Sequence, residues 1–252
     1  MITPPHRLRE IVDLSREIGS PARQLAILAE GNISMRTAPD LMLVKATGVN
    51  MATADDDGFV EVALDEFDRL IDSDLVGDDA VDALFRRATR WGTRRPSVES
   101  LLHAVFQRLD GADTVVHTHP TAVNALLCSD QADLLTAGSL FPDQIVVMGT
   151  QPLLIPYVDP GLPLARYVVH ALQSHIRAHG AAPKVVYLRN HGMFAIGTSA
   201  EDALGVTLMA VKSAQVLAGA LAVGKPVFLS ATEVARIDTR PDELLRRQLL
   251  SQ

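Results

Sequence analysis

Two apolar runs separated by only three residues constrain the fold of this chain more than any other feature. The stretch KVVYLRNHGMFAIG, residues 184–197, is typical of two strands joined at Asn190, His191 and Gly192. A turn this short joins antiparallel strands, because parallel neighbours need a crossover of about a dozen residues or more. Since several other pairs of expected strands also have short connections, we predict a mostly antiparallel sheet covered by helices.

Further periodic segments fill the chain. Apolar runs typical of strands occupy 41–46, 59–64, 114–119, 144–149 and 152–158. Segments with helical spacing or helix signals occupy 5–29, 64–71, 78–90, 97–109, 120–128, 163–179 and 200–223. There is no repeat and no linker long enough to divide the chain, so residues 1–252 are expected to form one α/β domain.

The charge of the chain argues against several classes of partner. Its formal net charge is −7 and its longest acidic cluster is 55–57, so it lacks the basic field that nucleic acids or anionic membranes require. No stretch approaches the ~20 apolar residues of a membrane span, and the N-terminus is unlike a secretion signal. Cys128 is the only cysteine, which fits a cytoplasmic protein. We expect Cys128 to be a small buried apolar residue.

The sequence VVHTHP, residues 115–120, carries two of the eight histidines. Side chains alternate between the faces of a strand, so His117 and His119 project to the same side, about 6 to 7 Å apart at their Cα atoms. Two imidazoles placed in this way can bind one metal ion. The pair alone does not decide between a metal site and two hydrogen-bonded histidines at a strand end.

Two further residues could complete a metal centre with this pair. His191 lies in a tight turn between two strands, where a short loop can present its imidazole to a cleft. Glu99 lies in the first turn of the helix that leads into the His117 strand, so its carboxylate could reach the same point. Three histidines and one glutamate are a common ligand set for a divalent ion, and zinc is its usual occupant. Such an ion can polarise a carbonyl group or stabilise an enediolate.

Five short motifs match one family in their order along the chain. They are GNIS at 31–34, ATG at 46–48, PSVE at 96–99, VVHTHP at 115–120 and NHGMFAIG at 190–197. With them the chain resembles the class II aldolase/adducin superfamily, which includes fuculose-phosphate and rhamnulose-phosphate aldolases and ribulose-phosphate 4-epimerases. The resemblance implies a single-domain, three-layer α/β/α fold with a mostly antiparallel central sheet. It also implies a homotetramer, commonly of C4 symmetry, with the zinc site near a subunit interface.

The same resemblance implies roles for individual residues. The metal histidines of the family correspond to His117, His119 and His191, and its metal-binding glutamate, which is also the acid/base, corresponds to Glu99. The resemblance makes His103 a neighbour of the ligands rather than a ligand. The implied cofactor is Zn²⁺, with Mn²⁺ or Co²⁺ as alternatives.

The resemblance places a substrate phosphate against Asn32, Thr47, Gly48 and Ser97. Physical chemistry agrees in part, because a Gly-Asn turn offers amide donors and an anion is favoured at a helix N-terminus, where Ser97 is expected. Each of these residues also has an ordinary explanation as a turn, a strand exit or a helix cap.

One departure from the family concerns the substrate anion. Val98 stands where aldolases of phosphorylated ketoses often have a second serine, so one hydroxyl group for the phosphate is missing. A cation at Lys45, Arg94 or Arg95 could compensate. Alternatively, the anion of the substrate could be a carboxylate.

A second departure concerns the acid that protonates the aldehyde oxygen. Some aldolases of the family supply a tyrosine from the neighbouring subunit, but the corresponding segment here, SLFPDQIVV at 139–147, has none. Asp143 or Gln144 could replace it. Three other histidines share one expected helix and are assigned to its surface: His170, His175 and His179.

These observations favour a zinc-dependent lyase that cleaves or forms a C–C bond of a small ketose phosphate through a metal-stabilised enediolate. Alternatives on the same fold are a metal-dependent decarboxylase of a hydroxylated acid and a sugar-phosphate 4-epimerase. A non-catalytic adducin-like module is disfavoured because all four metal positions hold ligand-type residues. A Schiff-base aldolase is disfavoured because no lysine lies in an activating context. The chain has no P-loop, GxGxxG or GxSxG motif.

Overall fold

A single eight-stranded sheet forms the centre of the computed structural model, which describes residues 5–243 and 245. The strand order is β4-β3-β2-β1-β5-β8-β7-β6, and all neighbours are antiparallel except β6 and β7. The strands are β1 Asn32–Ala38, β2 Leu41–Lys45, β3 Phe59–Ala63, β4 Thr89–Trp91, β5 Thr114–Thr118, β6 Leu153–Ile155, β7 Val185–Leu188 and β8 Gly192–Gly197. The prediction of a mostly antiparallel sheet is confirmed, with one parallel pair at its edge.

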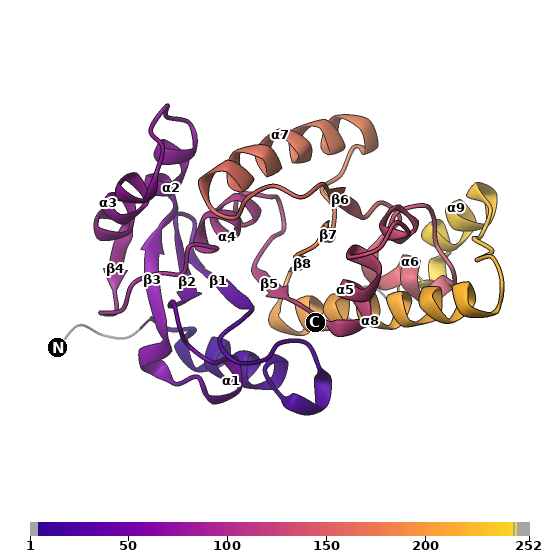
Figure 1. Cartoon of the computed structure of the whole chain (residues 1–252), viewed down its shortest axis with the longest axis horizontal. Helices are drawn as coiled ribbons and strands as arrows, with labels where there is room; N and C mark the ends of the chain where they lie inside the picture. The colour runs from indigo at the N-terminus through magenta and orange to yellow at the C-terminus, as the bar shows by residue number, and fades with distance from the viewer. Residues whose placement is uncertain (1–4, 244, 246–252) are drawn as a thin grey trace.

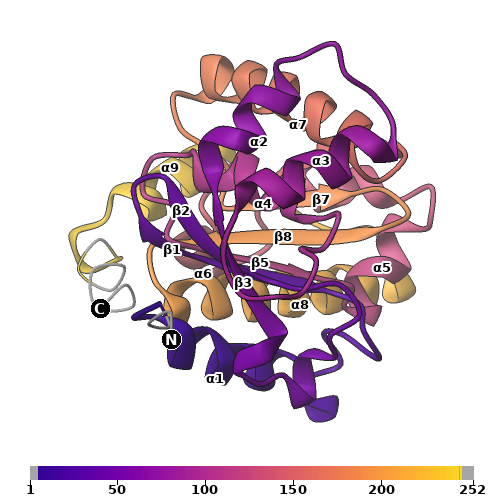
Figure 2. The same cartoon turned by 90° about the vertical axis from the view of Figure 1, so that its left-hand side faces the viewer.

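Helices cover both faces of this sheet (Figures 1 and 2). The side chains of α2, α3, α4 and α7 pack on one face, and those of α1, α5 and α8 pack on the other, while α6 packs against α8 and α9 against α6. The helices are α1 Leu8–Ile18, α2 Leu64–Ile71, α3 Asp78–Ala88, α4 Ser100–Gln107, α5 Thr121–Leu127, α6 Pro142–Met148, α7 Leu162–His179, α8 Ala200–Val223 and α9 Ala231–Thr239. The predicted three-layer α/β/α architecture is confirmed.

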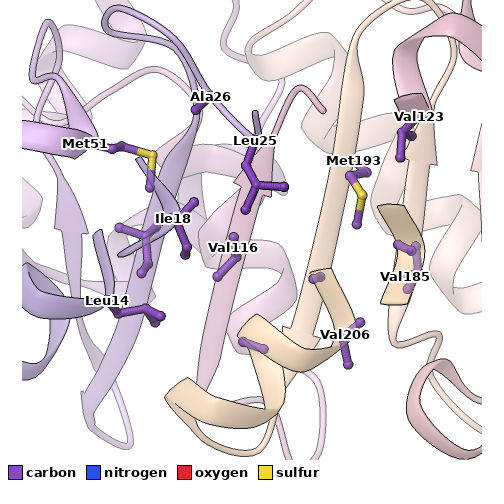
Figure 3. Close-up of a cluster of buried hydrophobic side chains, with 14 of the residues drawn as sticks. Leu14, Ile18, Leu25, Ala26, Met51, Val116, Val123, Val185, Met193 and Val206 are labelled. Atoms are coloured by element: carbon purple, nitrogen blue, oxygen red, sulfur yellow. The ribbon is translucent and has the colours of Figure 1, made fainter. Parts of the chain in front are cut away.

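The alternation of side chains along each strand divides the apolar interior into two clusters. In β8, Met193 and Ala195 join the cluster beneath α1, α5 and α8, whereas Phe194 and Ile196 join the cluster beneath α4 and α7. Figure 3 shows part of the first cluster, in which Val116 lies among labelled side chains of α1, β8 and α8. Full burial of one large apolar side chain contributes about 1.5–3 kcal/mol, so these two clusters hold the central strands in place.

The expected strand at 144–149 is wrong, because most of these residues belong to α6. Pro142 occupies the first turn of α6, where its fixed φ and missing N–H are tolerated. A short apolar run cannot be assigned to a strand or a buried helix by its periodicity alone. The sequence pattern also does not predict β1 or β4, so two of the strands are found only in the structure.

The helix expected at 97–109 begins later than predicted. A turn occupies 98–99, and α4 starts at Ser100, with Glu99 as the residue that precedes it. The Ser97 hydroxyl accepts only a 3.4 Å hydrogen bond from the Glu99 N–H and does not cap α4. The carboxylate of Glu99 therefore lies at the junction between loop and helix.

Two other expectations about burial are wrong. Cys128 is exposed rather than buried, because it follows the last turn of α5 at the start of a loop. His175 is buried rather than on the surface of α7. It follows Val168 by seven residues and Leu172 by three, which places it on the buried stripe of that helix.

The expectation that no stretch approaches a membrane span is wrong for α8, which is long and apolar enough to cross a membrane by length and composition alone. Core helices of folded domains meet the same criterion. In this structure α8 packs on β5 and β8 and contacts α1, α5 and α6, as Figure 1 also shows. Its buried residues Ala203, Val206, Ala210 and Leu217 form part of the cluster beneath the sheet.

Candidate metal centre and anion site

The four side chains predicted as metal ligands come together at one end of the central strands. His117 lies in β5, His119 follows it, His191 lies in the turn between β7 and β8, and Glu99 precedes α4. Each offers one nitrogen or oxygen ligand atom, and these atoms all lie within 4.8 Å of one another. Within residues 5–243 and 245, no other group of three or more histidine, cysteine or acidic side chains converges in this way.

The imidazole groups turn their Nε2 atoms toward a common point. Nε2 of His117 lies 3.1 Å from Oε1 of Glu99 and 3.0 Å from Nε2 of His119. Nε2 of His191 lies 3.6 Å from the same oxygen of Glu99. A tetrahedral ion with bonds of about 2.1 Å separates its ligand atoms by about 3.4 Å. These three separations are close to that edge length.

Hydrogen bonds at Nδ1 leave the Nε2 atoms free to bind a metal. Nδ1 of His117 lies 2.9 Å from the carbonyl oxygen of Met193, and Nδ1 of His119 lies 3.2 Å from Oε2 of Glu30. Carbonyl and carboxylate oxygens only accept hydrogen bonds, so each Nδ1 carries the proton and donates it. The two Nε2 atoms lie 3.0 Å apart, close enough for both to contact one cation.

The local backbone fixes the histidines in these positions. In the antiparallel pair of β5 and β8, His117 lies opposite Phe194, and the two rings stack with centroids 4.2 Å apart. The turn to β8 contains Asn190 at a φ of 57°, a left-handed conformation that asparagine tolerates better than most residues. Asn124 of α5 donates a 3.0 Å hydrogen bond to the carbonyl oxygen of His191. The turn that carries His191 is therefore held by a hydrogen bond from α5, which lies outside the sheet.

Gly192 permits the close approach of two candidate ligands. A Cβ atom at Gly192 would lie 2.4 Å from Cδ2 of His119 and 2.6 Å from the carbonyl oxygen of Thr118. Cβ contacts below 3.0 Å are essentially absent from proteins. The glycine is thus required by the packing of His119 and not by its own φ angle.

The electrostatic environment keeps Glu99 ionised and His119 neutral. Burial alone would raise the pKa of Glu99, but the charges and hydrogen bonds of His117 and His191 hold that pKa well below its usual range. Burial, with the neighbouring His117 and His191, lowers the pKa of His119 to about 4. Near neutral pH the centre therefore offers a carboxylate and a deprotonated imidazole nitrogen, the forms that bind metal.

Behind the candidate ligands, His103 is fully buried and is not among the four side chains that converge. Its Nδ1 lies 2.8 Å from Oγ of Ser34, and its ring meets the ring of Phe194 edge to face at 5.4 Å. Burial lowers the pKa of His103 to about 3, and His117 adds to this effect. His103 therefore stays neutral beside the centre.

Two of the predicted anion-binding segments lie side by side. Ala46 and Pro96 form an isolated β-bridge, and the N–H of Thr47 donates a 3.0 Å hydrogen bond to the carbonyl oxygen of Arg95. The next residue, Gly48, has a φ of 73° with open space beside its Cα atom. The backbone at Thr47 and Gly48 is exposed and accessible to a ligand.

Lys45 connects these segments to the loop that precedes Asn32. Its Nζ donates hydrogen bonds to the carbonyl oxygens of Val49, at 2.8 Å, and Ala29, at 3.3 Å. Its own carbonyl oxygen lies 3.5 Å from the N–H of Ser97. Lys45 is only 1 % exposed, and burial lowers the pKa of its ammonium group. Lys45 thus supports the loops that could bind the anion and does not itself project to the surface.

Asn32 offers a buried hydrogen-bond donor next to the metal ligands. It lies opposite His117 in the pairing of β1 with β5 and is fully buried. Its Oδ1 accepts a 2.8 Å hydrogen bond from the N–H of Ile33, whereas its Nδ2 has no partner among the described residues. A buried donor without a partner is costly, so this position suits a ligand oxygen.

Two of the other side chains considered for the anion or the acid, Arg95 and Gln144, are engaged elsewhere. Arg95 forms a 2.7 Å ion pair with Asp82 and lies over the ring of Phe85 at 4.8 Å. Gln144 is buried, and its Oε1 accepts a 2.8 Å hydrogen bond from the N–H of Leu140. Neither side chain is positioned as a free anion-binding or acid group.

The sheet lies between two helical layers and carries the convergent histidines. The chain is therefore an α/β domain with a histidine-rich candidate metal centre. The chain belongs to the Class II Aldolase and Adducin N-terminal domain family, whose sequence profile matches residues 9–218. The family's members include enzymes that are named aldolase, decarboxylase and dehydratase.

Individual relatives are distant. The chain is 27 % identical over 222 residues to an uncharacterized oxidoreductase, YuxG, of Bacillus subtilis, covering 84 % of this chain but only 29 % of that protein. It is 26 % identical over 211 residues to a 3-oxo-tetronate 4-phosphate decarboxylase of Haemophilus influenzae, covering 83 % and 86 % of the two chains. The structure of an L-fuculose-1-phosphate aldolase of Thermus thermophilus is similar, with a TM-score of 0.62, 23 % identity and coverage of 86 % and 97 %. This last likeness shows the fold.

Proposed function

We propose that this chain is a divalent-metal-dependent lyase that acts on a small, anionic hydroxycarbonyl substrate, with zinc as the metal. The observation that carries the proposal is the convergence of the Glu99 carboxylate and three imidazole groups, whose ligand atoms all lie within 4.8 Å of one another. Three nitrogens and one oxygen in a tetrahedral arrangement are typical zinc ligands, although Mn²⁺ and Co²⁺ also bind such sets. A bound divalent ion would act as a Lewis acid that polarises a substrate carbonyl group.

The residues around the centre have complementary roles in this proposal. Glu99 is held ionised, so it can accept a proton from the carbon next to the substrate carbonyl group and return it in the reverse direction. The unpartnered Nδ2 of Asn32 is available to a substrate oxygen. Thr47, Gly48 and Ser97 would bind the anionic group through hydroxyl and backbone N–H donors.

The reaction that we propose first is cleavage or formation of a C–C bond in a small ketose phosphate. Aldol cleavage needs a base for the proton and stabilisation of the negative charge that develops on oxygen, and the site offers both. Decarboxylation of a hydroxylated acid develops a similar charge and is the second candidate. Two observations favour it: the apolar, partly exposed Val98 beside the anion site, and the similarity to a relative named as a decarboxylase.

Metal binding is tested directly by stripping the protein with a chelator and titrating it with Zn²⁺ in a calorimeter. We expect one ion per chain for the wild type and no saturable binding for His117→Ala. His170→Ala is the matched control, because His170 is exposed on α7 and lies outside the centre. Failure of the folded wild-type protein to bind a divalent ion would refute the proposed function.

The reaction is tested with the Zn²⁺-loaded protein. One set of assays contains dihydroxyacetone phosphate and a panel of aldehydes, and a parallel set contains phosphorylated and unphosphorylated hydroxy acids. An aldol adduct supports the first reaction, and released CO₂ supports the second. If neither product forms, both reactions are rejected. We also propose a homotetramer, which sedimentation equilibrium tests independently.

A further inference from the structure

We propose that Glu30 is a positioning residue that fixes the tautomer and orientation of His119, a role that rests on the proposed metal centre. Oε2 of Glu30 lies 3.2 Å from Nδ1 of His119, and its side chain is 31 % exposed. The motifs of the sequence do not include Glu30, and nothing in its spacing from the histidines indicates a contact.

The Glu30 carboxylate is fixed at both oxygens. While Oε2 faces His119, Oε1 accepts a 2.8 Å hydrogen bond from the N–H of Ile27. One carboxylate thus links the backbone of its own loop to the imidazole. These two contacts fix the orientation of the carboxylate.

The loop that carries Glu30 is itself attached to the end of β5. The N–H of His119 donates a 2.9 Å hydrogen bond to the carbonyl oxygen of Leu25. Gly31 has a φ of 74°, and a Cβ atom there would lie 3.0 Å from the carbonyl oxygen of His117. The loop therefore packs tightly against the two histidines.

The chemical consequence follows from what a carboxylate can do. It accepts the Nδ1 proton of His119, which leaves the lone pair on Nε2, the atom that lies 3.0 Å from Nε2 of His117. A carboxylate at this position also raises the basicity of the imidazole as a metal ligand. His117 has a backbone acceptor in the same place, the carbonyl group of Met193, which no substitution removes. A substitution at Glu30 can therefore alter the orientation of His119 without removing any of the four candidate ligands.

The discriminating variant is Glu30→Gln, which is nearly isosteric. A glutamine has only one accepting oxygen, so it can accept a hydrogen bond from the N–H of Ile27 or from Nδ1–H of His119, but not from both. If its amide NH₂ faces His119, it favours the opposite tautomer, with the proton on Nε2 where the metal would bind.

The measurement is the Zn²⁺ dissociation constant of the full chain, obtained by competition with a chelator. We expect binding to weaken about 10- to 100-fold in Glu30→Gln, the range typical of partners of metal-binding histidines. Glu17→Gln is the matched control, since Glu17 pairs with Arg23 on the surface and contacts no histidine of the part of the chain that the structure describes. Its constant should stay within about twofold of wild type. Glu30→Asp, which keeps the charge but shortens the reach, is the second variant if Glu30→Gln does not fold.

Two further readouts separate positioning from a purely structural role. In a His119→Ala background, Glu30→Gln should cause no additional loss of affinity, because its effect passes through His119. The Co²⁺ absorption spectrum should change in Glu30→Gln and not in Glu17→Gln. If the wild type binds metal and the Glu30 variants bind within twofold of it, this inference is wrong while the proposed function stands. If the wild type binds no metal, both fail.

Discussion

Replacing Gly192 with alanine tests whether the packing of His119 determines metal affinity. The new Cβ atom would lie 2.4 Å from Cδ2 of His119 and 2.6 Å from the carbonyl oxygen of Thr118. Ordinary van der Waals contact begins at 3.4 Å, so the imidazole or the backbone must move by about 1 Å. Ligand geometry in a metal centre tolerates only about 0.2 Å before bonds are lost.

Two magnitudes follow for Gly192→Ala. Overpacking at a buried position typically costs about 1–3 kcal/mol in free energy of unfolding. Displacement of one of four ligands should weaken Zn²⁺ binding at least ~10-fold, which is ~1.4 kcal/mol. The assays are urea denaturation of the metal-free protein and chelator competition for the metal.

Gly205→Ala is the control for Gly192→Ala. Gly205 lies within α8, and a Cβ atom there meets nothing within 4 Å. Alanine should stabilise that helix by up to ~1 kcal/mol and leave metal affinity unchanged. A Gly192→Ala protein with wild-type affinity and wild-type stability would show that the close contact does not constrain His119.

Two other substitutions test the buried polar groups around the centre. Lys45→Met should cost about 1–3 kcal/mol in urea denaturation, because the carbonyl oxygens that accept from Nζ lose a buried donor; an unchanged midpoint would contradict this. The pKa of His103 is about 3 in the folded state, below the unfolded value of 6.5. The folded state therefore favours the neutral imidazole, and the stability that this contributes is complete above pH 6.5 and declines as the pH falls toward 3. Between pH 7 and pH 5 this loss is about 2 kcal/mol, and it should be absent in His103→Gln. Equal losses in both proteins would refute the assignment.

The parts of the site that the sequence predicts are those set by local geometry. The two-residue period of a strand places His117 and His119 on one side, and a three-residue turn must carry His191 back to the same end of the sheet. Glu99 is predictable because it lies just before a helix that leads directly into β5. In each case the informative contacts lie within or next to one element.

The parts that the sequence does not predict depend on contacts between distant segments. Glu30 and His119 are 89 residues apart, and no periodicity relates them. The role of Lys45 depends on the loops on either side of it, so its burial is visible only in the assembled sheet. The strand expected at 144–149 fails for a related reason, because a short apolar run takes its conformation from its neighbours.

The centre is held by protein contacts that do not need an ion. Stacking on Phe194 fixes His117, Asn124 fixes the turn of His191, and Glu30 fixes His119. When a metal binds to such a centre, little of the binding free energy is lost to ordering the chain. This differs from sites that form only when metal binding folds the domain. The fold thus holds the four candidate ligands close together through contacts of their own, so we expect this rigid positioning to favour metal binding.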